Sequence, residues 1–439
     1  MRRLKRVRQK PVEQRLSIGI LVVISMLIGF AVDNPPAWAQ ETGPEPFVAQ
    51  ALQANPELKS IDLQIQALRH KAEAVQKWMD PIFMVEYSNF PRDSWSLGDS
   101  PMTGVQFKLQ QTLTLGGKNE RREAVVQAET QAVGWSLAEK RNQLTDLVKR
   151  TYWSLSLVRQ LHLITRQHIE LVQQFVEVIR VKYQVGKAGQ HDLMRLEVLQ
   201  SKLEDDLFEF DRQERELSAA LNAAMHRSPG SYITTTDQTG STPPSLGLNE
   251  WIELAKSQRP ALKGLKSRAR AKTLAAAAAA YERWPDITVW AGYRIRSQAG
   301  MDDGTDQMSL GLAVPLPFNY SGSFDARRAM HLSEVSVLNE QETALLDKIK
   351  ADLESSLAAW GRAHQKATTY SEKLIPKVKK TLDSTLAAYQ SNRADFASLY
   401  QVEIQLLDFE RVMLVARSQT WIRKSMVETL AGNHVSENK

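Results

Sequence analysis

Four short segments of the chain alternate apolar and polar residues one by one, and each is apolar on one side only. A period of two is the pattern of a β-strand, in which successive side chains point to opposite faces of a sheet. The pattern therefore predicts four strands, over residues 82–88, 105–110, 287–295 and 308–314.

Helical spacing of apolar residues fills most of the remaining chain. It predicts helices over 47–79 and 251–283, each followed by a proline that stops it, Pro81 or Pro285. Residues 119–184 contain no proline and no turn cluster, and these 66 residues in one helix would reach about 100 Å at 1.5 Å per residue. A helix of that length cannot fit inside a compact domain.

The last third of this long helix carries two apolar seams with alternating spacings of three and four residues. One seam begins at Ile169, and the other begins at Leu171 and is broken only by Lys182. Two seams indicate two neighbouring helices, as in a closed ring of helices. A second long helix should kink at Pro376, because proline removes an intrahelical hydrogen bond.

The chain is a tandem duplication. Pro56 and Pro81 recur as Pro260 and Pro285 at an offset of 204 residues, and the YQVGKAG stretch that starts at Tyr183 recurs as YQSNRAD 206 residues later. Repeated order of this kind indicates two copies of one unit. The segment between them is rich in turn formers, which marks the boundary. The predicted division is a leader at 1–39, a first repeat at 40–227, a linker at 228–248, a second repeat at 249–431 and a tail at 432–439.

The recurring stretches occupy turns between antiparallel helices. Gly186 and Asn392 fall where the chain must turn left-handed after a helix, and glycine and asparagine are the residues that tolerate this conformation. Turn chemistry alone would explain both residues, so a simple hairpin without a partner stays open as an alternative.

The first 39 residues have the features of a secretory signal peptide. They combine seven Lys/Arg residues, an apolar run of about 15 residues, and Ala-Trp-Ala at 37–39 as a cleavage pattern. An uncleaved membrane anchor is the alternative. The rest of the chain carries 49 basic and 48 acidic residues, so the basic balance gives no support to nucleic-acid binding. There is no cysteine, which excludes disulfides and an acylated N-terminal cysteine.

Four amphipathic strands cannot close a transmembrane barrel, because unpaired backbone groups are costly in lipid and barrels begin at about eight strands. Symmetric copies would supply the missing strands. In such a barrel Phe83, Phe107, Val289 and Leu312 would face lipid. The charged residues expected to face a wet lumen are Glu86, Lys108, Arg294 and Arg296. The competing interpretation is a soluble protein with two half-buried hairpins packed on helices.

Nearly the whole mature chain resembles the TolC-like outer membrane efflux protein family. The resemblance is carried by the duplicated order of elements, by FKLQQTLTLGGKNERREA at 107–124, by AVPLPFNYSGSFDARRA at 313–329, and by the helix hairpin at 183–197. It implies a mainly α-helical homotrimer with an α-helical tunnel in the periplasm and a twelve-stranded β-barrel in the outer membrane. The Gln-x-Leu-x-Leu-Gly-Gly-Lys pattern at 111–118 resembles the heavy-metal efflux branch.

The resemblance also implies which residues meet a partner. The two helix hairpins should contact a periplasmic adaptor, which links the channel to an inner-membrane pump. The implied contact residues are Gly186, Lys187, Ala188 and Asp192 in the first hairpin and Asn392, Arg393, Ala394 and Asp395 in the second.

The constriction of the tunnel departs from the family pattern. Ser398 and Gln401 stand where family members commonly carry aspartates, which puts an acidic gate at these positions in doubt. Asp192 keeps its place in the first copy, and Asp395 or Glu403 could substitute in the second.

No residue set for catalysis or for a cofactor is found, and we predict a protein that is not an enzyme. The eight histidines lack metal-ligand spacing; only His191, at the first hairpin, is close to a predicted site, and a surface histidine is its simpler interpretation. The sequence therefore favours a passive export channel for metal ions or small toxic compounds. The alternatives are the channel of a type I protein secretion system and a periplasmic coiled-coil scaffold without a pore.

Overall fold

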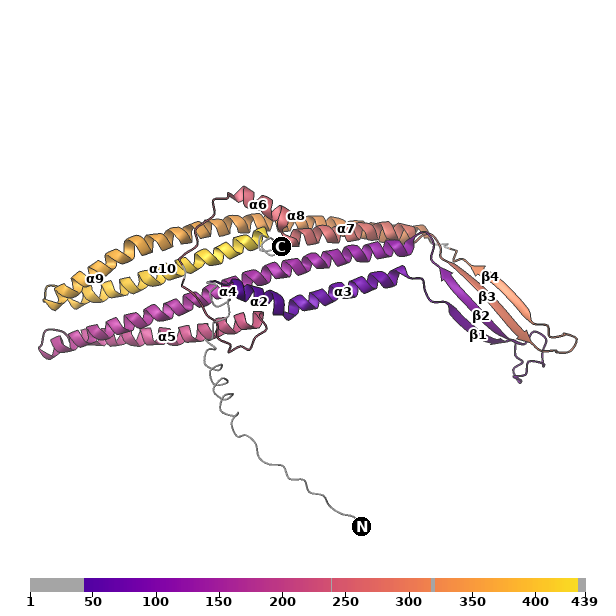
Figure 1. The fold of residues 1–439 in the computed structure, drawn as a ribbon, viewed down its shortest axis with the longest axis horizontal. Helices are drawn as coiled ribbons and strands as arrows, with labels where there is room; N and C mark the ends of the chain where they lie inside the picture. Colours follow the sequence, from indigo (N-terminus) through magenta and orange to yellow (C-terminus); the bar gives the residue numbers. More distant parts are fainter. Residues whose placement is uncertain (1–42, 238, 317–319, 433–439) are drawn as a thin grey trace, which may run out of the picture.

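The computed structural model describes residues 43–237, 239–316 and 320–432. The predicted leader and nearly all of the predicted tail lie outside these residues. Within them the chain is mainly helical, with one four-stranded sheet at one end (Figure 1). The elements are α2 (Glu45–Ala54), α3 (Pro56–Gln76), β1 (Ile82–Ser88), β2 (Gly104–Leu113), α4 (Lys118–Gln184), α5 (Gln190–Ala224), α6 (Leu248–Gln258), α7 (Pro260–Tyr281), β3 (Ile287–Arg296), β4 (Gln307–Ala313), α8 (Tyr320–Thr369), the π-helical turn η2 (Tyr370–Leu374), α9 (Ile375–Gln390) and α10 (Phe396–Ala431).

The structure repeats one succession of elements twice. A short helix and a longer helix lead into a β-hairpin, and a very long helix then runs back along the molecule to a turn and a returning helix. The two β-hairpins join into one antiparallel sheet of order β1-β2-β3-β4 (Figure 1). The two helix hairpins, α4–α5 and α9–α10, lie side by side at the opposite end of the molecule.

The long helix is present as predicted. α4 has 67 residues, which corresponds to about 100 Å. Its two seams are occupied by two neighbours, because α4 packs against α5 on one side and against α10 on the other (Figure 1). Phe175 and Ile179 of α4 are buried in the resulting core together with Leu203 of α5 and Leu399 of α10.

The first helix of each copy is not continuous, and this part of the prediction was wrong. Asn55 and Arg259 have extended backbones with ψ of 122° and 116°, and they divide α2 from α3 and α6 from α7. Each precedes a proline, and the proline ring disfavours the helical conformation of the residue before it. The breaks are anchored on neighbouring helices: the Asn55 amide donates to the Ala224 carbonyl at 3.0 Å, and Arg259 pairs with Glu139 at 2.8 Å.

The irregularity expected at Pro376 takes the form of a π-helical turn. η2 ends just before Ile375, and Pro376 stands in the first turn of α9. Proline has no N–H to donate, and its ring crowds the carbonyl four residues earlier, so the helix widens there by one residue.

Candidate functional site

The register of the sheet sorts its side chains into two chemically different faces. Phe107 of β2 pairs with Val85 of β1 and with Tyr293 of β3, and Tyr293 pairs in turn with Met308 of β4. Paired residues point to the same face, and the face alternates along each strand. One face therefore consists almost entirely of apolar side chains: Phe83, Val85, Tyr87, Val105, Phe107, Leu109, Ile287, Val289, Ala291, Tyr293, Ile295, Met308, Leu310 and Leu312.

None of the helices that the structure describes covers the apolar face. The sheet projects beyond the ends of the helices (Figure 1), and Leu310 and Leu312 are 79% and 71% exposed. An uncovered apolar face of this extent marks a contact with lipid or with another molecule. The alternative of half-buried hairpins packed on helices is therefore wrong.

The opposite face is mostly polar, although it also carries Ile82, Met84 and Trp290. All four charged residues expected in a lumen, Glu86, Lys108, Arg294 and Arg296, lie on it. The Lys108 ammonium lies 4.4 Å from the centre of the Trp290 ring, and the Arg294 guanidinium donates to Ser88 Oγ at 2.9 Å. Arg296 instead pairs with Asp302 in the β3–β4 loop.

Aromatic residues flank the sheet at both ends. Trp78 and Trp284 follow α3 and α7 where the chain enters the sheet, and they are 61% and 58% exposed. At the far end, Tyr87, Phe90 and Trp95 form one cluster, with the rings of Tyr87 and Trp95 stacked at 6.1 Å. Aromatic girdles above and below an apolar band are typical of strands that cross a bilayer.

The helix hairpins end in two turns with the same backbone structure. Gly186 and Asn392 have φ of +70° and +58°, as predicted for left-handed positions. In each turn the residue at this position donates its N–H to the carbonyl three residues earlier, and the next residue donates to the carbonyl five residues earlier. This is the Schellman arrangement, which completes the hydrogen bonding at the end of α4 and of α9.

The remaining hairpin residues divide between solvent and core. Lys187 and Arg393 are exposed, whereas Ala188 and Ala394 pack against the apolar core. Asp192 accepts from the Gly189 N–H at 3.3 Å, and Asp395 accepts from the Ser398 N–H at 2.9 Å. Both carboxylates cap the helix that leaves the turn, α5 or α10. Hydrogen bonding from Ser398 lowers the pKa of Asp395.

Lys182, which interrupts the second seam of α4, joins the two hairpins. Its ammonium donates to the Tyr389 carbonyl and, at 2.8 Å, to Asn392 Oδ1, and it lies 4.1 Å from the centre of the Tyr389 ring. The sequence showed only an irregularity in the seam. The partners of Lys182 lie 207 and 210 residues away in the chain, so its role could not be found from spacing.

A second polar link lies deeper in the hairpin core. Both nitrogens of the His168 ring face carboxylates of α10: Nδ1 lies 2.5 Å from Glu403 and Nε2 lies 2.9 Å from Glu410. Lys379 of α9 adds a contact of 2.8 Å to Glu410. Burial opposes the charge on His168, but the hydrogen bonds that the protonated ring donates to both carboxylates outweigh it and raise the pKa of His168 to about 9.

The His168 cluster contains Glu403, one of the residues expected at the tunnel constriction. Glu403 is only 2% exposed and is enclosed between α4 and α10, so it does not line a tunnel in this structure. Ser398 and Gln401 lie on the exposed surface of α10. His168 had no metal-ligand spacing along the chain; the seven-residue spacing of Glu403 and Glu410 on one helix face was the available signal.

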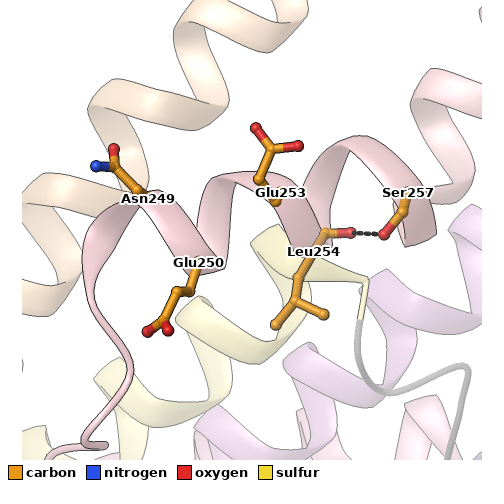
Figure 2. Close-up of a pocket in the computed structure, with 5 residues that line it drawn as sticks. All are labelled: Asn249, Glu250, Glu253, Leu254 and Ser257. Atoms are coloured by element: carbon orange, nitrogen blue, oxygen red, sulfur yellow. Dashed lines mark hydrogen bonds between the residues drawn. The ribbon is translucent and has the colours of Figure 1, made fainter.

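No site suited to a cofactor or metal emerges in the described ranges. They contain no group of three or more His, Cys, Asp or Glu residues placed to hold a metal ion. A hollow of about 600 Å³ over α6 is lined by residues of that one helix alone (Figure 2). The polar groups there serve the helix itself: Glu250 accepts from the Gly247 N–H at 2.7 Å, and Ser257 Oγ donates to the Leu254 carbonyl at 3.0 Å. The hollow is therefore an open depression on the surface of α6.

Comparison with known proteins agrees with this geometry. Residues 47–225 match the family model described as "Outer membrane efflux protein". Among solved structures, a membrane protein from Pseudomonas aeruginosa is 17% identical with a TM-score of 0.76, covering 89% of this chain and 90% of that one. The outer membrane protein VceC from Vibrio cholerae is 15% identical with a TM-score of 0.71, covering 89% and 96%. CusC, described in terms of transmembrane channel formation, is 14% identical with a TM-score of 0.72, covering 90% and 95%. No curated protein sequence matches.

None of the helices in the described part of the chain is both long enough and apolar enough to cross a membrane. The family match covers the first copy, and the likeness of fold extends over both copies. The first repeat thus matches the outer membrane efflux protein family, and the described chain as a whole has the TolC-like fold.

Proposed function

We propose that this protein is the outer membrane channel of a tripartite efflux system. Three copies would bring their four strands each into a twelve-stranded barrel in the outer membrane, and their long helices would form a tunnel through the periplasm. A periplasmic adaptor at the helix hairpins would connect the tunnel to an inner-membrane pump, which supplies the energy. The channel itself is a passive path, and the protein catalyses no reaction.

The uncovered apolar face of the sheet carries this proposal. Strands β2 and β3 have ten residues each, which is the length that a tilted strand needs to cross the hydrocarbon core of a bilayer. β1 and β4 are edge strands, each with one side unpaired within the chain. Because open edges are not tolerated in lipid, the sheet has to continue into neighbouring copies.

The polar face then lines the water-filled path. Glu86, Lys108 and Arg294 would face the barrel lumen, together with Arg296 where it is held by the β3–β4 loop. Asp192, Asp395, Ser398 and Gln401 remain candidates for the narrow end of the tunnel, because they lie at or beside the hairpin turns. Without aspartates at the last two positions, this end would repel anions less than an acidic gate does.

The cargo is proposed to be metal ions or small toxic compounds. The support for metal ions is the Gln-x-Leu-x-Leu-Gly-Gly-Lys pattern at 111–118. In the structure this pattern has a structural role: Gly116 and Gly117 have φ of +73° and +67°, and Lys118 pairs with Asp286 at 2.6 Å. It therefore holds the junction between sheet and helices, and it bears on cargo only through the family branch that it resembles.

Planar bilayers test the central proposal. The mature chain, purified in detergent, should run as a trimer and give single-channel conductance. A monomer that is soluble without detergent would refute it and would favour the periplasmic scaffold. A deletion strain grown on a panel of metals and dyes then identifies the cargo. Loss of a secreted polypeptide with unchanged metal and dye tolerance would favour a type I secretion channel.

A further inference from the structure

The hairpin end of the molecule has two free edges. α9 and α5 form opposite edges, with α10 and α4 between them (Figure 1). α9 packs on α10, α10 packs on α4, and α4 packs on α5. Each edge helix therefore buries one face inside the chain and leaves the opposite face without a described neighbour.

The free face of the η2–α9 edge is basic. α9 buries Ile375, Val378 and Leu382 toward α10. At 100° per residue, Lys377 and Lys380 fall on the opposite side, and Lys373 stands one turn before Lys377. The three lysines are exposed, and none forms an ion pair with any residue that the structure describes. The small residues Ser384 and Ala387 continue this face toward the turn.

The free face of α5 is acidic and partly apolar. α5 buries Leu196, Leu199 and Leu203 toward α4. The opposite side carries Val198 and Phe208, which are 69% and 73% exposed. Three exposed carboxylates accompany them: Glu197, Glu204 and Asp205. Among the described residues none of the three is in an ion pair, and Glu204 accepts only from Gln200, at 2.8 Å.

The two faces lie at the same height along the molecule. Arg159 and His162 of α4 contact Glu214 and Asp211 of α5, so paired residues in this hairpin have numbers that add to 373. Lys182 of α4 contacts the Tyr389 carbonyl of α9, which sets the level between the hairpins. Together these contacts place Lys373, Lys377 and Lys380 level with about residues 200 to 207 of α5. This range includes Glu204 and Asp205, which lie at the opposite edge of the same chain.

We propose that the lysine face of one copy docks on the carboxylate face of α5 of the next copy. This inference rests on the proposed function, since it takes the hairpins as segments of a ring. The contact is heterologous, because two different faces meet, and such a contact closes a ring when the rotation allows it. Val198 and Phe208 supply apolar area, while the opposite charges set the register and exclude a wrong neighbour.

A disulfide between the two faces tests the register directly, because the chain contains no cysteine of its own. Asp205→Cys with Lys377→Cys should give covalent dimers and trimers on a non-reducing gel after mild oxidation of intact membranes. The matched control is Asp205→Cys with Ala387→Cys, whose positions differ by about 18 Å in level and exceed the reach of a disulfide. No cross-link in the first pair, or equal cross-linking in both, would overturn the proposal.

Charge reversal tests the energetics. K373E/K377E/K380E and E197K/E204K/D205K should each reduce the trimer yield by roughly tenfold or more, because like charges would face each other. Combining all six changes should restore the trimer, which also shows that the variants fold. R195E/K202E reverses two exposed charges on the flank of α5 and should leave the yield unchanged.

The outcomes separate the two proposals. A wild-type chain that forms no trimer contradicts both. A conducting wild-type trimer whose triple variants assemble normally contradicts only the docking of the lysine face on α5.

Discussion

Raising the pH should loosen the contact between α4 and α10, because it removes the proton that His168 holds. The pKa of His168 is raised from 6.5 to about 9 by Glu403 and Glu410, against the effect of burial. Below pH 6.5 the ring is protonated in both folded and unfolded chains, so its contribution to stability is complete. Between pH 6.5 and 9 only the folded chain keeps the proton, and above pH 9 the contribution is lost.

The size of the effect follows from the shift. One pKa unit corresponds to about 1.4 kcal/mol, so the change from 6.5 to about 9 amounts to roughly 3 kcal/mol per chain. His168 is 4% exposed and Glu403 is 2% exposed, so screening by solvent reduces this figure little. The loss should therefore be visible as a lower unfolding midpoint at pH 9.5 than at pH 6.5.

Urea unfolding followed by circular dichroism measures this loss in detergent-solubilised protein. The comparison is H168Q/E403Q/E410Q, which keeps the size and hydrogen-bonding capacity of the cluster but cannot hold the proton. The wild type should lose about 3 kcal/mol more than this variant between the two pH values. Equal pH dependence in both proteins would refute the assignment of a protonated His168. A single H168Q change is the less informative variant, because it leaves the buried Glu403 carboxylate without a cationic partner and costs about 3 to 5 kcal/mol near neutral pH.

Three further predictions concern the hairpin turns and the sheet. Gly186→Val should weaken binding of the adaptor in a pull-down, because valine resists a positive φ by about 1 to 2 kcal/mol. Gly186→Asn should bind normally, as Asn392 serves the same position in the second repeat. Wild-type binding by the valine variant at normal trimer levels would contradict this prediction. Lys182→Met should speed hydrogen exchange at the α9–α10 turn, since its two hydrogen bonds to Tyr389 and Asn392 are lost. Lys202→Met, a change at an exposed lysine of α5, should not. Equal exchange in both variants would contradict a stabilising role of Lys182 at this turn. Leu312→Arg should reduce membrane insertion, at a cost of about 2 to 4 kcal/mol in mid-bilayer, and Gln106→Arg on the polar face should not. Membrane fractionation measures the inserted share of each variant, and equal shares would contradict the assignment of the two faces.

Much of the architecture could be derived from the pattern of residues. Period-two alternation located all four strands within a few residues, since a strand exposed to different solvents on its two sides must alternate. The absence of proline and turn residues predicted the full length of α4, and the left-handed positions at Gly186 and Asn392 followed from local turn chemistry. These features depend on neighbours in the chain, which is why sequence alone was sufficient.

The breaks at Asn55 and Arg259 mark the limit of that reasoning. The prolines after them match between the two repeats, yet a proline at the first turn is compatible with a helix that simply starts there. What decides the break is the packing of each junction against a distant helix, such as Asn55 on the Ala224 carbonyl. Such contacts bring together residues more than a hundred positions apart.

By itself, the sequence determined the elements, their duplication and the two-faced strands, because periodicity and turn chemistry act over a few residues. Only the tertiary structure decided that the two β-hairpins join into one sheet with one face almost entirely apolar. It also decided that Lys182 and His168 contact the second repeat of the same chain, and that Glu403 is buried rather than exposed to a tunnel. The physical reason is that a charge in a helix seam is stable only where the fold brings an opposite charge or an acceptor to it, and no local pattern records that partner.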